Sequence, residues 1–75
     1  MPLKPLPARV IVKKLQKLGF QKVSQKGSHL KLRKTIKEKT YNVIVPMHNK
    51  DIAISVIGRI LEQGNIKWED IESVK

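Results

Sequence analysis

Hydrophobic residues near the start of the chain recur every three or four positions, which is the spacing of one face of an α-helix. The stripe consists of Ala8, Ile11, Val12, Leu15 and Leu18, and lysine or arginine fills most positions between them. Pro7 suits the first turn of a helix, and Gly19 stands where helices end on a left-handed residue. The pattern predicts a helix over residues 8–18.

The hydrophobic pattern then changes to alternation, which is typical of β-strands. Strands are predicted over residues 20–26, 29–34 and 41–45. The first is weakly apolar, and the third is rich in β-branched and aromatic residues. Gly27-Ser28 supplies the turn of a tight hairpin, and the polar residues 35–40 predict a second turn. Pro46 ends the third strand because proline cannot donate to the ladder.

Helical spacing returns in the second half of the chain. The apolar positions are Ile52, Ala53, Val56, Ile57, Ile60 and Leu61. Asn49 is a suitable N-cap, Asp51 would lie favourably in the first turn, and we expect the helix to end before Gly64. Residues 66–74 predict one short helical turn, with Trp68 and Ile71 covering an end of the core.

The order of helix, three antiparallel strands and helix predicts an α+β fold of a single domain over residues 1–75. At this length two helices can cover only one face of the sheet, which leaves the other face open to water. Leu30 and Leu32 would face the helices, so His29, Lys31 and Arg33 would lie on the open face. Because the core is small, we expect a shallow surface site rather than a deep cleft.

Charge is concentrated in the first half of the chain. The net charge is +10, and residues 1–39 hold twelve basic side chains and one acidic one. Residues 40–75 hold four basic and five acidic side chains. A one-sided basic field favours a polyanion such as a nucleic acid as the partner, although a lysine-rich surface can also serve solubility alone.

Several classes of protein fit the composition poorly. The chain has no cysteine, which excludes disulfides, thiolate zinc sites and cysteine nucleophiles and fits a reducing cytoplasm. The longest mainly apolar run, residues 52–57, is far shorter than the ~18 residues of a membrane span, and the N-terminus lacks the apolar stretch of a signal peptide. With two histidines and few acids, the chain offers no set of metal ligands, so we expect no bound metal. We also expect no cofactor, no membrane contact and a cytoplasmic location.

Three short motifs resemble those of a known family. They are Leu18-Gly19-Phe20 at a helix end, Gly27-Ser28-His29 before a strand, and Val45-Pro46-Met47-His48 before an amphipathic helix. Together and in this order they resemble the HicA toxins, the RNA-cleaving partners in HicA–HicB toxin–antitoxin pairs, over about residues 8–71. The resemblance implies a fold like the double-stranded-RNA-binding domain and ribosome-independent cleavage of messenger RNA. It also implies a HicB antitoxin that covers the site in a hetero-oligomer, and a catalytic histidine at His29.

Cleavage of RNA needs no metal when the ribose 2′-hydroxyl is the nucleophile. A base must take its proton, an acid must protonate the leaving 5′-oxygen, and cations must hold the phosphate. Histidine suits both proton transfers because its unperturbed pKa is about 6.5. We therefore expect His29 to act as the base, or as base and acid in turn.

The residues around His29 predict the rest of the site. Lys26, Lys31 and Arg33 would bind the RNA phosphates, and the small residues Gly27 and Ser28 would allow close approach of the backbone. His48 is a second candidate for proton transfer, because it precedes a helix start where anions are welcome. The alternative is that His48 only packs or caps locally.

Two other functions fit the same charge and fold class. A non-catalytic double-stranded-RNA-binding module would need no histidine, and His29 would then be an exposed strand residue among phosphate-binding cations. A protein-interaction domain with a basic surface would show no affinity for nucleic acid once salt is controlled. The role of His29 separates the first reading from the other two.

Overall fold

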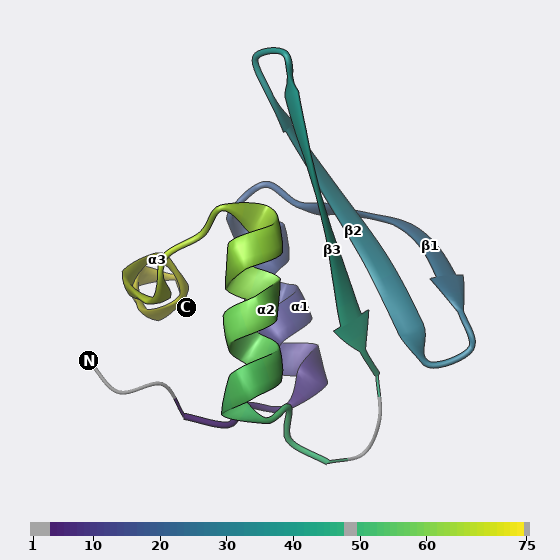
Figure 1. Cartoon of the computed structure of the whole chain (residues 1–75), viewed down its shortest axis with the longest axis vertical. Helices are drawn as coiled ribbons and strands as arrows, with labels where there is room; N and C mark the ends of the chain where they lie inside the picture. The colour runs from purple at the N-terminus through teal and green to yellow at the C-terminus, as the bar shows by residue number, and fades with distance from the viewer. Residues whose placement is uncertain (1–3, 48–49, 75) are drawn as a thin grey trace.

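The computed structural model describes residues 4–47 and 50–74. The elements in chain order are α1 (Ala8–Lys17), β1 (Gln21–Lys26), β2 (His29–Ile36), β3 (Lys39–Pro46), α2 (Ile54–Gly64) and α3 (Trp68–Ser73), as Figure 1 shows. The order confirms the predicted α-β-β-β-α arrangement. The short helix α3 forms where the sequence predicts a last helical turn.

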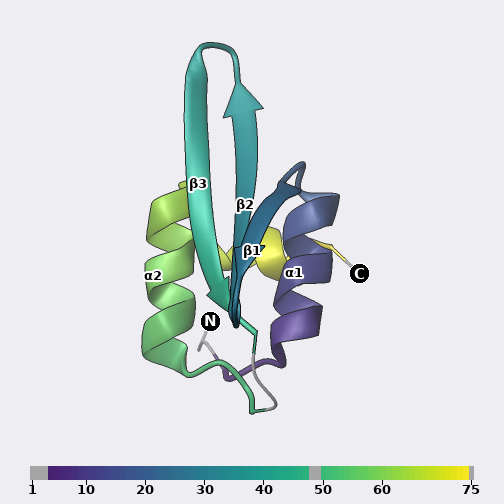
Figure 2. The same ribbon diagram turned by 90° about the vertical axis from the view of Figure 1, so that its right-hand side faces the viewer.

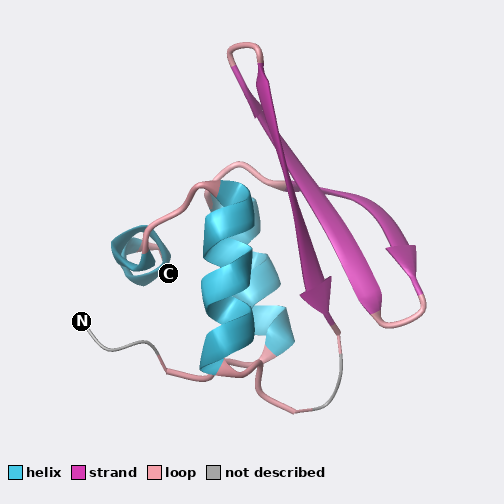
Figure 3. Cartoon of the chain, viewed as in Figure 1, coloured by secondary structure: helices cyan, strands magenta, loops and turns pink. Residues whose placement is uncertain are grey.

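The strands form one antiparallel sheet in the order β1-β2-β3. Helices α1 and α2 both lie on one side of this sheet, and its other face is turned toward the viewer in Figure 2. The short helix α3 lies on the side away from the sheet (Figure 3). The predicted fold class, like that of double-stranded-RNA-binding domains, is therefore confirmed.

The core lies between the sheet and the helices. In β2 and β3 the buried side chains alternate with more exposed ones, as expected for strands with one covered face. Each large apolar side chain in this core contributes about 1.5–3 kcal/mol by leaving water. The fully buried ones are Phe20, Ile11, Leu15, Leu32, Ile52, Ile57, Ile60, Ile71, Val43 and Val45.

Helix α1 ends as predicted from the Leu-Gly-Phe motif. Gly19 takes a left-handed conformation with φ +105°, its N–H donates to the Gln16 carbonyl at 3.1 Å, and the Phe20 N–H donates to the Leu15 carbonyl at 3.0 Å. This pair of bonds is a Schellman motif, which satisfies the last carbonyls of a helix. The chain thereby turns back, and Phe20 is buried in the core.

The beginning of α2 differs from the prediction. The helix starts at Ile54 with Ala53 as N-cap, so Asp51 precedes the first turn, and Asn49 itself lies outside the described residues. The cause is a long-range contact. Ile52 forms an isolated antiparallel bridge with Leu6, and its N–H donates to the Leu6 carbonyl at 2.7 Å. Ile52 is thus buried as part of an extended segment and not as part of the helix.

The end of α2 also differs. Gly64 is the last helical residue, and Asn65 takes the left-handed conformation expected of a glycine, with φ +54°. Asparagine tolerates this conformation better than most residues. Gly64 meets a different need, since an added Cβ would lie 2.9 Å from Cζ of Phe20 and 2.8 Å from Cδ1 of Ile66. Close packing, and not backbone conformation, requires glycine here.

The hairpin of β2 and β3 is longer than predicted. Pairing continues through Thr35↔Thr40 and Ile36↔Lys39, so the turn is only Lys37-Glu38 and not residues 35–40. Thr35 and Thr40 are polar but β-branched, and β-branched residues favour strands. The resulting arm extends past the helices in Figure 1. Strand β1 is exposed along its whole length, on both faces.

Lys14 joins α1 to α3. Its Nζ donates to the carbonyls of Ile71 at 3.1 Å and Val74 at 2.7 Å. These carbonyls lie at the C-terminal end of α3, where helices lack internal donors and favour a positive charge. The half-buried Lys14 is therefore a structural residue, whereas Arg9, Lys13 and Lys17 of the same helix are exposed.

Candidate functional site

The face of the sheet opposite the helices carries the predicted row of basic side chains. Leu30 and Leu32 are buried in the core, while His29 and Arg33 are exposed and Lys31 is half-buried. The prediction that these three residues lie on the open face is confirmed. His29 stands at the first position of β2, next to the turn that joins β1 to β2.

The turn places Lys26 directly beside His29. The two residues are cross-strand partners, so their side chains lie on the same face with their Cβ atoms about 4.5–5.5 Å apart. Gly27 has φ +61° at the first central position of the two-residue loop, where type II′ turns use glycine. Gln25 Nε2 donates to the Gly27 carbonyl at 3.1 Å. The turn, and with it the position of His29, is therefore well held.

The other end of this turn is tied to the chain that follows β3. The N–H of Met47 donates to the carbonyl of Ser28. Gly27 and Ser28 are both exposed, so a bound chain can approach their backbone closely. His48, the second predicted proton-transfer residue, lies outside the described residues.

The remaining predicted cations lie farther along β2. At about 3.4 Å per residue, Lys31 is about 7 Å from His29 along the strand and Arg33 about 14 Å. Arg33 Nε donates to Oδ1 of Asn42, its cross-strand partner, at 2.9 Å. This bond uses one of the five guanidinium donors. The row thus spans more than one phosphate, with Lys26 nearest to the histidine.

Helix α2 contributes residues that the sequence analysis missed. A depression of about 300 Å³ begins at His29 and is bordered by Arg59 and Gln63 of α2. The Oε1 atom of Gln63 accepts a hydrogen bond from the N–H of Ile44 at 3.2 Å, which satisfies a donor on the outer edge of β3. Arg59 is the only basic residue of α2, and that isolated charge was the available signal.

The charged side chains of the sheet are of one sign, because its three strands carry lysine and arginine. Strands β1, β2 and β3 contain no aspartate or glutamate. In residues 4–47 and 50–74, no group of three or more His, Cys, Asp or Glu side chains could hold a metal ion. Within the same residues, none of the helices has the length and apolar character that crossing a bilayer requires. The face around His29 is suited to an anion.

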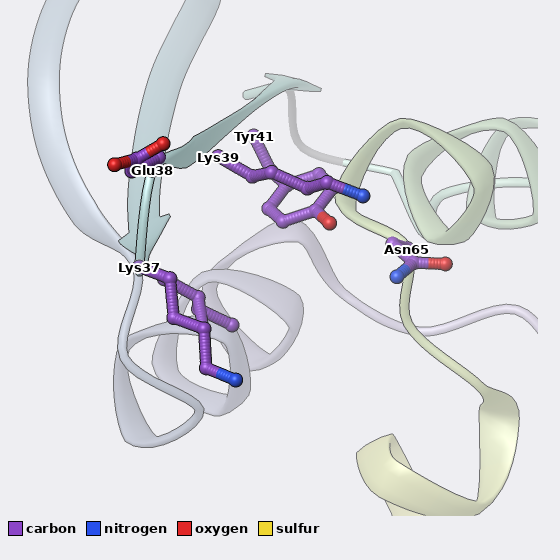
Figure 4. A pocket seen from close by; sticks show the side chains of 6 residues that line it. Lys37, Glu38, Lys39, Tyr41 and Asn65 are labelled. Atoms are coloured by element: carbon purple, nitrogen blue, oxygen red, sulfur yellow. The ribbon is translucent and has the colours of Figure 1, made fainter.

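A larger hollow of about 660 Å³ lies elsewhere, at the tip of the hairpin arm. Figure 4 shows Tyr41 and Lys39 of β3 pointing toward Asn65 at the end of α2, with Lys37 and Glu38 at the turn. Ile36 and Lys39, which border it, are cross-strand partners. Each lies four residues along its strand from a buried residue, Leu32 in β2 and Val43 in β3, and therefore on the same face as that residue. This hollow is therefore on the helix side of the sheet and separate from His29.

Comparison with known proteins agrees with this geometry. Residues 8–66, from the start of α1 to just past the end of α2, match the model of a family described as "HicA toxin of bacterial toxin-antitoxin". A comparison with curated proteins gave no match. The family match covers most of the 75 residues, including the Gly-Ser-His turn and the three strands that hold it. The chain therefore belongs to the HicA toxin family, the toxins of bacterial toxin–antitoxin systems.

Proposed function

We propose that this toxin is a metal-independent endoribonuclease that cleaves messenger RNA, with His29 as its catalytic residue. The observation that carries the proposal is the exposed imidazole beside Lys26 on a basic sheet face. An imidazole in that place can reach a bound ribose without any opening of the fold. The chain belongs to a toxin family, which supports an activity that harms the cell. Cleavage of messenger RNA would be such an activity.

The reaction needs only groups that this face supplies. His29 takes the proton from a ribose 2′-hydroxyl, and the resulting oxygen attacks the adjacent phosphorus. The bond from phosphorus to the 5′-oxygen breaks, and that oxygen takes a proton from the imidazolium of His29 or from a second acid, for which the sequence offers His48. The products are a 2′,3′-cyclic phosphate and a 5′-hydroxyl, with no net change in protons.

The cations divide between the reacting phosphate and its neighbours. Lys26, opposite His29, and Lys31, two residues along β2, are close enough to stabilise the charge that develops on the phosphorus oxygens. Arg33 lies farther along the strand, so its part is to hold a neighbouring phosphate and fix the register of the chain. The turn at Gly27 and Ser28 leaves room for the backbone of the RNA.

The basic open face also defines the partner that would control the toxin. A HicB-type antitoxin would cover His29 and its cations in a hetero-oligomer, and a surface with acidic side chains would match the charge of this face. The free toxin would act in the cytoplasm, where messenger RNA is available, and the antitoxin would bind it there. Covering the face would block RNA without any change in the toxin fold.

Labelled single-stranded RNA and DNA of the same sequence, incubated with the purified protein in excess EDTA, test this function. We expect the RNA to be cut and the DNA to remain intact, and the rate to be the same with and without EDTA. Binding of RNA without cleavage would instead identify a non-catalytic RNA-binding module. Cleavage that EDTA abolishes and magnesium restores would contradict metal independence.

A further inference from the structure

The residues that line the depression beside His29 suit a ligand group other than a phosphate. Its floor is apolar, formed by Ile44 and Pro46 of β3 and by Val56 and Ile60 of α2. Ile44, although apolar, is 38% exposed. Phosphates gain nothing from such a floor, whereas the flat face of a nucleobase packs well on apolar side chains. A volume of about 300 Å³ is at the lower end for small-molecule sites and suits one base.

The polar border of the depression offers hydrogen-bond donors. The Gln63 Oε1 atom is occupied by the N–H of Ile44, so the Gln63 amide presents its NH₂ group to a ligand. Arg59, which borders the same depression, has only donors. Base edges that carry acceptors match such a border, namely O2 and O4 of uracil or O6 and N7 of guanine. The positive charge of Arg59 also fits a polyanionic chain.

We propose that this depression is the base subsite of the toxin and holds the base of the nucleotide whose 2′-hydroxyl is deprotonated by His29. This inference rests on the proposed function. The base is attached to C1′, next to the C2′ that carries the reacting hydroxyl. When that hydroxyl reaches the imidazole, the base must lie beside His29. The depression begins at His29 on the side of α2, while Lys26 and the turn occupy the other side.

An abasic substrate tests the subsite directly. Two RNA oligonucleotides with one cleavage site are compared, identical except that the second lacks the base on the nucleotide 5′ of the cut and keeps its 2′-hydroxyl. We expect kcat/KM to fall about tenfold without the base, the magnitude of one lost base-stacking contact. Both substrates keep every phosphate, so the comparison isolates the base.

Filling the depression provides the matched control. Val56→Phe places a ring in the depression, and Ser55→Phe places the same ring at the neighbouring exposed position of α2. We expect Val56→Phe to cut the intact and the abasic RNA at nearly equal rates, and Ser55→Phe to keep the difference seen in the wild type. Should Val56→Phe fail to fold by circular dichroism, Arg59→Met replaces it and must change the base preference at that one position.

The outcomes separate the subsite from the function on which it rests. Equal cleavage of intact and abasic RNA by the wild type would overturn the subsite and leave the nuclease intact. The same holds if Ser55→Phe and Val56→Phe behave alike, or if Arg59→Met leaves the base preference unchanged. If the wild type cuts no RNA at all, the proposed function fails and the subsite fails with it.

Discussion

Replacement of His29 by alanine is expected to lower the rate of RNA cleavage by about 10²–10⁴-fold, the usual contribution of a general acid–base residue. His29 is exposed, and the buried leucines of β2 face the other way. The substitution therefore removes the proton acceptor without opening a cavity in the core. Cleavage of a labelled RNA at a single site, measured with enzyme in excess, gives the rate of the chemical step.

A control variant shows that the loss belongs to the imidazole. Thr35 lies on the same strand and the same face as His29, near the tip of the hairpin arm, and is also exposed. Thr35→Ala should retain nearly the full rate, and both variants should unfold at nearly the same urea concentration as the wild type. A His29→Ala protein that is folded and still cuts RNA within a few-fold of the wild-type rate would remove His29 from the mechanism.

Gly64→Ala is expected to destabilise the fold by about 1–3 kcal/mol, the usual effect of adding a methyl group to a packed core. The new Cβ would lie under 3 Å from both Phe20 and Ile66. Phe20 is 2% exposed and follows the end of α1, so it cannot move away without disturbing the junction of the two helices. Equilibrium unfolding in urea, followed by the fluorescence of the single tryptophan, Trp68, measures the loss.

A second glycine of the same helix serves as the matched control. An added Cβ at Gly58 would meet no atom within 4 Å, and alanine is favoured over glycine within a helix by about 1 kcal/mol. Gly58→Ala should therefore stabilise the protein while Gly64→Ala destabilises it. Changes of the same sign in the two variants would contradict the packing at the end of α2.

The position of His29 could be predicted because a strand allows only two faces. Once Leu30 and Leu32 are assigned to the core, their neighbours must lie on the open face. The hydrophobic period likewise predicts both long helices. These features depend on residues close together in the sequence, and the structure agrees with them.

The features that could not be predicted depend on contacts between distant parts of the chain. Ile52 has the spacing of a helical residue, but its pairing with Leu6 keeps it extended. The helical period shows which side of α2 faces the core, but not that α2 lies along β3 and that Arg59 lines the same depression as His29. The long arm was missed because its threonines read as a polar turn although they pair as strands.

The central claim is that the imidazole of His29 removes the proton of a ribose 2′-hydroxyl, and one altered atom in the substrate tests it. An RNA with a single cleavage site is compared with the same RNA carrying 2′-deoxyribose only at the nucleotide 5′ of the cut, both in EDTA. We predict that the all-ribose RNA is cut to a 2′,3′-cyclic phosphate and that the deoxy linkage stays intact. Cleavage of the deoxy linkage at a similar rate would contradict the account.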